Sequence, residues 1–130
     1  MKAQATFDIT KWEQLASEER DGLTIARNHV EKTFAGGIEG TSTAELLMAT
    51  TAHEGSAAYV GFERLTVRVG DHAGSFLLRH DATMTRGTPT ADWAIVPDSG
   101  TGGLAGISGA GTIAQEPAGG HTFTLQYELP

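Results

Sequence analysis

Hydrophobic and polar residues alternate along most of this chain, which is the pattern of β-strands that bury one face. The first alternation puts Ala3, Ala5, Phe7 and Ile9 on one face and polar residues between them. The same two-residue period recurs in the segments 23–34, 38–51, 57–69, 74–85, 91–96 and 122–129. With a further short strand near 111–115, the pattern predicts seven or eight strands.

Turn-forming residues separate these segments and indicate how the strands connect. Gly36–Gly37 is a strong hairpin signal, His53-Glu54-Gly55 makes a second turn, and Pro97 ends a strand. Sequential hairpins favour an all-β fold, an antiparallel, up-and-down closed β-barrel, because closure removes exposed sheet edges. A β-sandwich is the alternative. No helical periodicity supports an α/β fold.

Two segments depart from the alternation. The polar stretch 13–22 is expected to interrupt the first strand and has room for no more than one short helical turn. The glycine-rich stretch 98–111 contains no Lys or Arg that could hold a phosphate, so tight turns are its expected purpose.

Size and charge narrow the classes of partner. A chain of 130 residues is the usual size of one domain, so a single barrel over 1–130 is expected. The formal charge of −7 disfavours nucleic acid and anionic membranes, which bind through clustered Lys and Arg. The absence of cysteine excludes disulfides and zinc–thiolate sites. The segment MKAQATFDITK has no continuous apolar run and reads neither as a signal peptide nor as a membrane span, so a cytoplasmic location is expected.

A carboxylate and an imidazole share the apolar face of two neighbouring strands. If Asp71 and His72 form a two-residue loop, Gly70 pairs with Ala73 and the register is fixed. The facing pairs are then Val69–Gly74, Val67–Phe76, Leu65–Leu78 and Glu63–His80. Glu63 and His80 would lie about 5 Å apart at Cβ within an apolar wall.

Three interpretations of this pair are open. Buried Glu63 and His80 can share a proton near neutral pH and act as general acid and base. Alternatively, they only satisfy each other's hydrogen bonds and fix the register. In the third interpretation, this end of the strands is exposed and both side chains are hydrated.

Other candidates for an internal site are polar atoms on apolar faces. Asn28 shares a face with Val30 and Phe34 and is expected to point inward. Three aromatic candidates for ligand contact are Tyr59, Trp93 and Tyr127. The pattern favours an ordinary core position for each of them, with the polar atom bonded to the backbone, over contact with a ligand. The five histidines do not form a convincing ligand set, so no metal is expected.

Several sequence blocks resemble one uncharacterised bacterial family, domain of unknown function 3224. The blocks are 33–40 (TFAGGIEG), 44–48 (AELLM), 60–64 (VGFER), 74–80 (GSFLLRH), 96–106 (VPDSGTGGLAG) and 123–129 (FTLQYEL). The resemblance spans nearly the whole chain and implies a barrel like that of allene oxide cyclase. Relatives of that barrel catalyse or steer the cyclisation of apolar substrates, so a link to cyclase activity is an analogy of fold.

These observations lead to two hypotheses. In the first, the barrel holds a small apolar molecule and isomerises or cyclises it without a cofactor, with Glu63 and His80 moving protons. In the second, the protein is a non-catalytic ligand carrier or a module whose barrel is packed solid. Phe62 and Leu77, on the face opposite the predicted core, are compatible with a homo-oligomer interface and also with isolated exposed residues.

Overall fold

The computed structural model describes residues 1–117 and 119–130, and these residues form nine β-strands. The strands are β1 (Lys2–Arg20), β2 (Leu23–Gly36), β3 (Ile38–Thr50), β4 (Ala57–Val69), β5 (His72–Thr85), β6 (Thr88–Ile95), β7 (Thr101–Gly102), β8 (Ser108–Gln115) and β9 (His121–Glu128). Among the described residues there is no helix, and hence none that could span a membrane.

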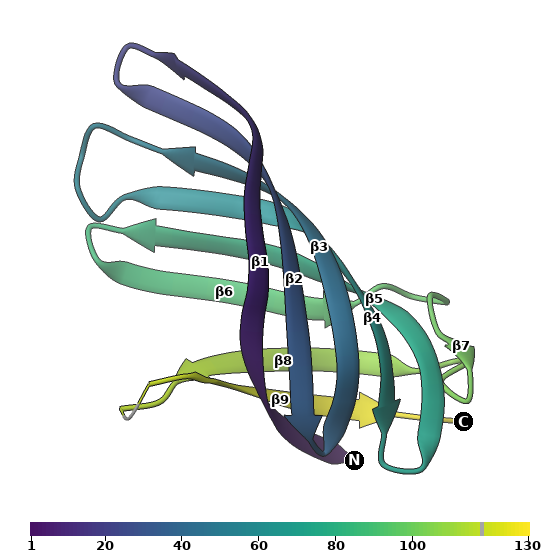
Figure 1. Ribbon diagram of the computed structural model, residues 1–130. Coiled ribbons are helices and arrows are strands. Elements are labelled where there is room, and N and C mark those ends of the chain that lie inside the picture. The colour runs from purple at the N-terminus through teal and green to yellow at the C-terminus, as the bar shows by residue number, and fades with distance from the viewer. Residues whose placement is uncertain (118) are drawn as a thin grey trace.

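Eight of the strands close into an antiparallel barrel, as predicted (Figure 1). Neighbours in sequence pair from β1 to β6, β6 then pairs with β8, β8 with β9, and β9 returns to β1. The two-residue strand β7 is an addition outside this ring and pairs with β5. The strands β8 and β7 both come from the glycine-rich segment and its end, where the sequence predicted only turns and one short strand.

One predicted break does not exist. The polar stretch 13–22 does not interrupt the first strand; β1 continues to Arg20, and only Asp21 and Gly22 turn the chain. Two irregularities in the pairing with β2, between Ile9 and Lys11 and between Gln14 and Ala16, shift the alternation. Both faces of this part of β1 are exposed, so no buried side of the strand constrains its sequence to alternate.

One half of the barrel is filled by side chains. The inner faces of β1 to β6 and β9 contribute to a single cluster, with members such as Phe76, Leu78 and Leu125 almost completely buried, and Ile113 of β8 packs against it. Gly111 lies over this core, and a Cβ atom there would collide with the Phe123 ring, so the glycine lets β8 approach closely. This half is solid, as small eight-stranded barrels commonly are.

The glycine-rich segment closes the same end of the barrel. Leu104 and Ile107, between β7 and β8, are buried and belong to the core cluster. Ser99 Oγ accepts a hydrogen bond of 3.0 Å from the Leu77 backbone N–H, which ties the segment to β5. The chain's C-terminus lies at this end (Figure 1). The segment therefore acts as a cap, which agrees with the prediction of tight turns.

The opposite half of the barrel opens out. The strands β1 to β6 curve away from β8 and β9 and form an extension that ends in three hairpin turns (Figure 1). The pairing of β1 with β9 stops at Phe7, and β6 pairs with β8 only through Trp93 and Ala94. The wall between β6 and β1 is therefore complete near the cap and incomplete at the other end, which leaves a mouth.

The predicted register between β4 and β5 was wrong by two residues. Val69 pairs with His72, so the loop consists of Gly70 and Asp71, and Glu63 faces Leu78 while Gly61 faces His80. Gly70 has a φ of +60°, the positive value that two-residue hairpin turns require at their first loop position, and glycine adopts it without strain. A shift of two residues leaves every side chain on its original face.

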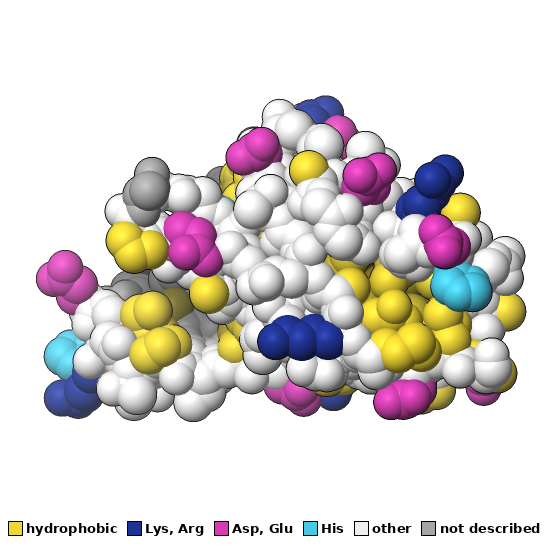
Figure 2. Space-filling model, turned by 90° about the horizontal axis from the view of Figure 1, so that it is seen from below, with side chains coloured by type: hydrophobic (Ala, Val, Ile, Leu, Met, Phe, Trp, Pro, Cys, Tyr) yellow, Lys and Arg dark blue, Asp and Glu magenta, His cyan; other side chains and the backbone are white. Residues whose placement is uncertain are grey.

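The outer surface mixes charges of both signs. In Figure 2, Lys and Arg side chains stand apart from one another among acidic ones, and hydrophobic side chains gather in two groups. Phe62 on β4 is exposed and Leu77 on β5 is half-buried, and both lie on the face opposite the core, as predicted. Whether this face binds a second copy of the chain stays a prediction.

Candidate functional site

A buried carboxylate forms the centre of a polar network inside the barrel. His80 Nε2 lies 2.7 Å from Glu63 Oε1, so the two side chains meet although they are not directly opposite in the register. Lys32 Nζ donates to the same oxygen at 3.3 Å, and the Ser42 hydroxyl donates to Oε2. Glu63 and His80 are 1% and 3% exposed, which excludes the hydrated interpretation of the pair.

The network keeps Glu63 ionised. Burial by itself raises the pKa of this carboxyl, but the His80 hydrogen bond, the Lys32 charge and the Ser42 hydroxyl outweigh it and lower the pKa to about 2. At neutral pH Glu63 is therefore a charged acceptor that no longer shares a proton with its partner. The Lys32 ammonium balances its charge, so the site needs no charged His80 to be neutral overall.

The ionised carboxylate fixes the orientation and tautomer of His80. Because a carboxylate can only accept hydrogen bonds, Nε2 must carry a proton, which leaves Nδ1 as an acceptor in the neutral ring. Nδ1 is buried and has no hydrogen-bond partner among the described residues. Buried polar atoms are rarely left without a hydrogen-bond partner. The unpaired Nδ1 is therefore a candidate for contact with a ligand or for a role in catalysis.

A cavity of about 250 Å³ lies beside this network, and we call it the lumen cavity. Every strand of the barrel contributes at least one side chain to its wall, and the wall is mainly apolar. The residues that line it are Phe7, Ile9, Trp12, Val30, Lys32, Ala44, Leu46, Met48, Tyr59, His80, Trp93, Ile113 and His121. A smaller buried cluster of Val30, Ala44 and Leu46 forms part of this wall, so the barrel is solid at its capped end and has a cavity beside that cluster towards its mouth.

A second cavity, the extension cavity, continues from the first. It has a volume of about 290 Å³, lies along β3 to β6 and shares Met48, Tyr59 and Trp93 with the lumen cavity. Met84, Pro89 and Ala91 are among its apolar lining residues. The two cavities together reach the size range in which proteins usually bind small molecules.

Two aromatic side chains flank His80. Its ring centroid lies 6.0 Å from that of Trp93, edge to face, and 6.2 Å from that of Tyr59. Trp93 Nε1 is a second buried atom that lacks a hydrogen-bond partner in the described part of the chain. Burial raises the pKa of the Tyr59 phenol, and the neighbouring Trp93 offsets only part of this, so Tyr59 stays a protonated donor.

The predicted site residues fall into two groups. Glu63, His80, Tyr59 and Trp93 come together around the lumen cavity or directly beneath its wall. Asn28 is buried on the inner face of β2, as predicted, without bordering the cavity, and Tyr127 packs into the solid half. Of the six residues singled out in the sequence, the last two are therefore not positioned to touch a molecule in this cavity.

Sequence reasoning missed three polar residues of the site: Lys32, Ser42 and His121. Lys32 shares the inward alternation of Val30 and Phe34, and Ser42 shares that of Ala44, so the same signal that selected Asn28 could have found both. His121 stacks on Phe7 with ring centroids 5.0 Å apart, and its position at the start of β9 hid its inward direction.

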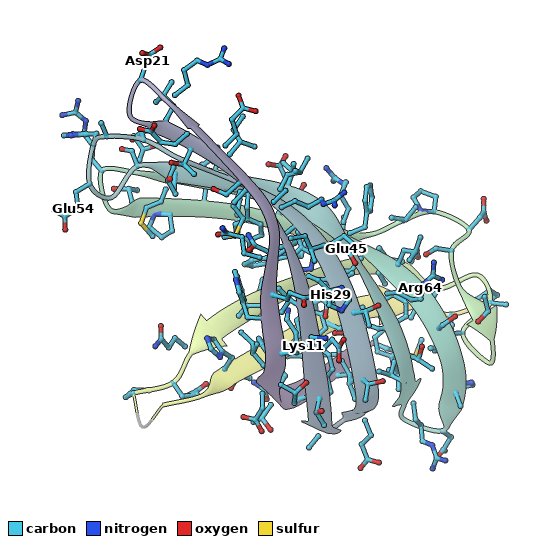
Figure 3. The ribbon with its side chains drawn as sticks, turned by 45° about the horizontal axis from the view of Figure 1, so that its top comes forward. Lys11, Asp21, His29, Glu45, Glu54 and Arg64 are labelled. Carbon is cyan, nitrogen blue, oxygen red and sulfur yellow. The ribbon has the colours of Figure 1, made fainter. Side chains whose placement is uncertain are left out.

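A second histidine–carboxylate group lies on the outer face and is separate from the cavity. His29 bonds Glu45 at 2.7 Å through Nδ1 and Glu31 at 2.8 Å through Nε2. Figure 3 shows His29 and Glu45 over the middle of the sheet, on neighbouring strands and far from the turns that carry Asp21 and Glu54. These contacts are formed in solvent, where ion pairs contribute little.

Comparison with known proteins places the chain in a family without naming a function. A family model described as "Protein of unknown function (DUF3224)" matches residues 3–127. A solved structure, a protein of unknown function from the DUF3224 family of Shewanella oneidensis MR-1, is 32% identical, with a TM-score of 0.92. That similarity covers 100% of this chain and 98% of the other. No curated protein matches the sequence. The chain belongs to the DUF3224 family.

Proposed function

We propose that this barrel binds a small, mainly apolar molecule with at least one polar group, and that the molecule occupies the lumen cavity. The observation that carries the proposal is a hollow, apolar half-barrel with two buried polar atoms, His80 Nδ1 and Trp93 Nε1, that lack partners among the described residues. Leaving such an atom unpaired costs about 1–3 kcal/mol, so a ligand that pairs with one of them gains affinity.

The size and lining of the cavities support the class of ligand. Aliphatic and aromatic side chains make up most of both walls, and such walls favour an apolar body. Lys32, Tyr59 and His80 place polar groups on β2, β4 and β5, and His121 places another on β9, so the ligand's polar end would face one of these groups. Continuity with the extension cavity gives a longer molecule room towards the mouth.

The competing function is a structural module that binds nothing. The solid half of the barrel and the hydrogen-bonded state of Glu63 are what that hypothesis expects. That hypothesis does not explain the lumen cavity, because the interior of a protein that binds nothing is expected to be close-packed.

Native mass spectrometry of the purified protein, followed by xenon or small-ketone binding in crystals, tests the proposal. Apolar cavities of this size bind xenon, so density in the lumen cavity and none in the capped half is the expected result. A protein that carries no ligand and shows no occupancy at saturating probe would contradict it.

Two substitutions on neighbouring positions of β3 provide a matched comparison. Met48→Trp should fill the space between the two cavities and abolish probe binding, because Met48 borders both. Leu47→Trp places the same bulk on the outer face, where Leu47 is 50% exposed, and should leave binding unchanged. Equal binding by both variants would show that the probe occupies another place.

A further inference from the structure

The His80 side chain combines three features that the binding proposal does not use. Nε2 is held by a carboxylate that stays ionised, Nδ1 has no partner in the described chain, and the ring borders the lumen cavity. A neutral imidazole in this orientation is a base at Nδ1, and the adjacent carboxylate stabilises the imidazolium that forms when Nδ1 takes a proton.

Potential hydrogen-bond donors lie next to this base. Trp93 Nε1–H can only donate, and the Tyr59 hydroxyl is a protonated donor; both rings flank His80. Neutral donors in an apolar cavity are suited to an oxygen atom that gains negative charge during a reaction. A base beside a hydrogen-bond donor suits a carbonyl compound. The base can remove a proton from the carbon next to the carbonyl group, and the donor can stabilise the negative charge that develops on the carbonyl oxygen.

We infer that His80 moves a proton on an enolisable ketone in the lumen cavity, with the carbonyl oxygen held by Trp93 or Tyr59. This inference rests on the proposed function, since it concerns the molecule bound there. The substrate class is a small apolar ketone, and the reaction is a shift of a carbon–carbon double bond or exchange of the proton beside the carbonyl.

The step balances within the protein and the substrate. Nδ1 takes a proton from the carbon next to the carbonyl, the electrons of that C–H bond form a C=C bond, and the C=O electron pair moves to oxygen. The enolate oxygen accepts a hydrogen bond from Trp93 or Tyr59. The imidazolium then returns the proton to the same carbon or to the far end of the conjugated system, and neither a cofactor nor an oxidant is consumed.

Glu63 and Lys32 are positioning residues in this scheme. Glu63 holds the ring by its 2.7 Å contact and stabilises the imidazolium, and Lys32 keeps the carboxylate ionised. Because His80 Nδ1 and Trp93 Nε1 are both buried below the cavity wall, a neighbouring ring has to shift for a substrate to reach either atom. Trp93 is the candidate, since its indole borders both cavities.

Cyclohex-3-enone is a suitable probe, because it is small and becomes the conjugated cyclohex-2-enone when its double bond shifts. The conversion is followed by ultraviolet absorbance and by deuterium uptake from D₂O in NMR spectra. We expect the wild-type protein to accelerate both over buffer and His80→Gln to lose roughly 10²–10⁴-fold of that acceleration. Trp93→Phe removes one donor and should cost roughly 10²-fold or more if that donor holds the oxygen.

The substitution Glu63→Gln tests whether Glu63 supports proton transfer by His80 or only stabilises the fold. Without the charge, the imidazolium forms less readily, so the pH at half-maximal rate should fall. A purely structural Glu63 would lower the rate at every pH without moving this midpoint. His29→Gln is the matched control, because it removes a histidine with carboxylate contacts of 2.7 and 2.8 Å on the outer face and should leave the rate unchanged.

Binding and turnover are measured on the same samples, so the two proposals fail in different ways. Saturation-transfer NMR reports whether the ketone occupies the cavity, and thermal unfolding shows whether each variant is folded. A ketone that binds but exchanges no faster than with folded His80→Gln overturns the proton-transfer inference and leaves the binding proposal intact. A ketone that fails to bind, together with no xenon in the cavity, overturns the binding proposal.

Discussion

The two halves of this barrel are made from the same strands and the same alternation, yet one is filled and the other is hollow. At the capped end Phe76, Leu78 and Leu125 meet across the axis with Leu104 from the cap, all nearly inaccessible to solvent. Towards the mouth the cavity wall includes the small residue Ala44 on β3, and the strands flare apart (Figure 1). The divergence of the strands leaves space towards the mouth, whereas large side chains and the cap fill the other end.

The comparison shows that the buried polar network lies where the close-packed core meets the cavity. The buried charges of Glu63 and Lys32 lie at the border between the halves, next to the solid core on one side and the lumen cavity on the other. A rigid core can hold a polar network in one orientation, and a neighbouring cavity can hold a small molecule in contact with that network.

The largest expected effect comes from emptying the solid half. Phe76→Ala should lower the free energy of unfolding by about 3–5 kcal/mol, because it leaves a void in a close-packed cluster. Met48→Ala, in the hollow half, should cost about 1 kcal/mol, since Met48 already borders empty space. Urea denaturation of both variants measures the difference, and similar losses would mean that the halves are packed alike.

Breaking the buried ion pair should come next in size. Glu63→Leu leaves the Lys32 ammonium buried without its partner and should destabilise the protein by about 3 kcal/mol. The double variant Lys32→Met/Glu63→Leu should recover most of this loss, because two apolar side chains fill the same space without charge. Failure of the second substitution to restore stability would show that the cost arises from packing, with charge playing no part.

The ionised state of Glu63 predicts a pH dependence. Its pKa in the folded protein, about 2, is below the ordinary value of 4.5, so the network stabilises the fold above pH 4.5. That stability is lost as the pH falls from 4.5 towards 2, because the unfolded chain takes up the proton first. Thermal unfolding across this window should show a steeper loss for the wild type than for Glu63→Gln, and parallel curves would contradict the assignment.

The smallest effect is expected on the outer face. The hydrogen bonds to Glu45 and Glu31 raise the pKa of His29 above 6.5, so its contribution is complete below pH 6.5 and lost as the pH rises through the raised value. The group is exposed to solvent, and His29→Gln should therefore change the melting temperature only marginally at low pH and not at high pH. A loss comparable to that of Glu63→Leu would refute the contrast between inner and outer networks.

Much of the fold was accessible from the sequence because alternation reports burial directly. It gave both ends of β4 and the start of β2, the inward direction of Glu63 and His80, and the closed barrel. It failed in the second part of β1, where pairing irregularities shift the period and neither face is buried. It also misplaced the β4–β5 loop, because the choice between Gly70–Asp71 and Asp71–His72 depends on backbone angles.

Along the regular strands, the alternation in the sequence determined on which side of the wall the side chains lie, since a two-residue period survives any even shift of register. Only the tertiary structure decided what those side chains meet. Lys32 and Ser42 reach Glu63 from β2 and β3, the cap fills one end, and the strands diverge at the other. These are contacts between segments far apart in sequence, and a local pattern carries no record of them.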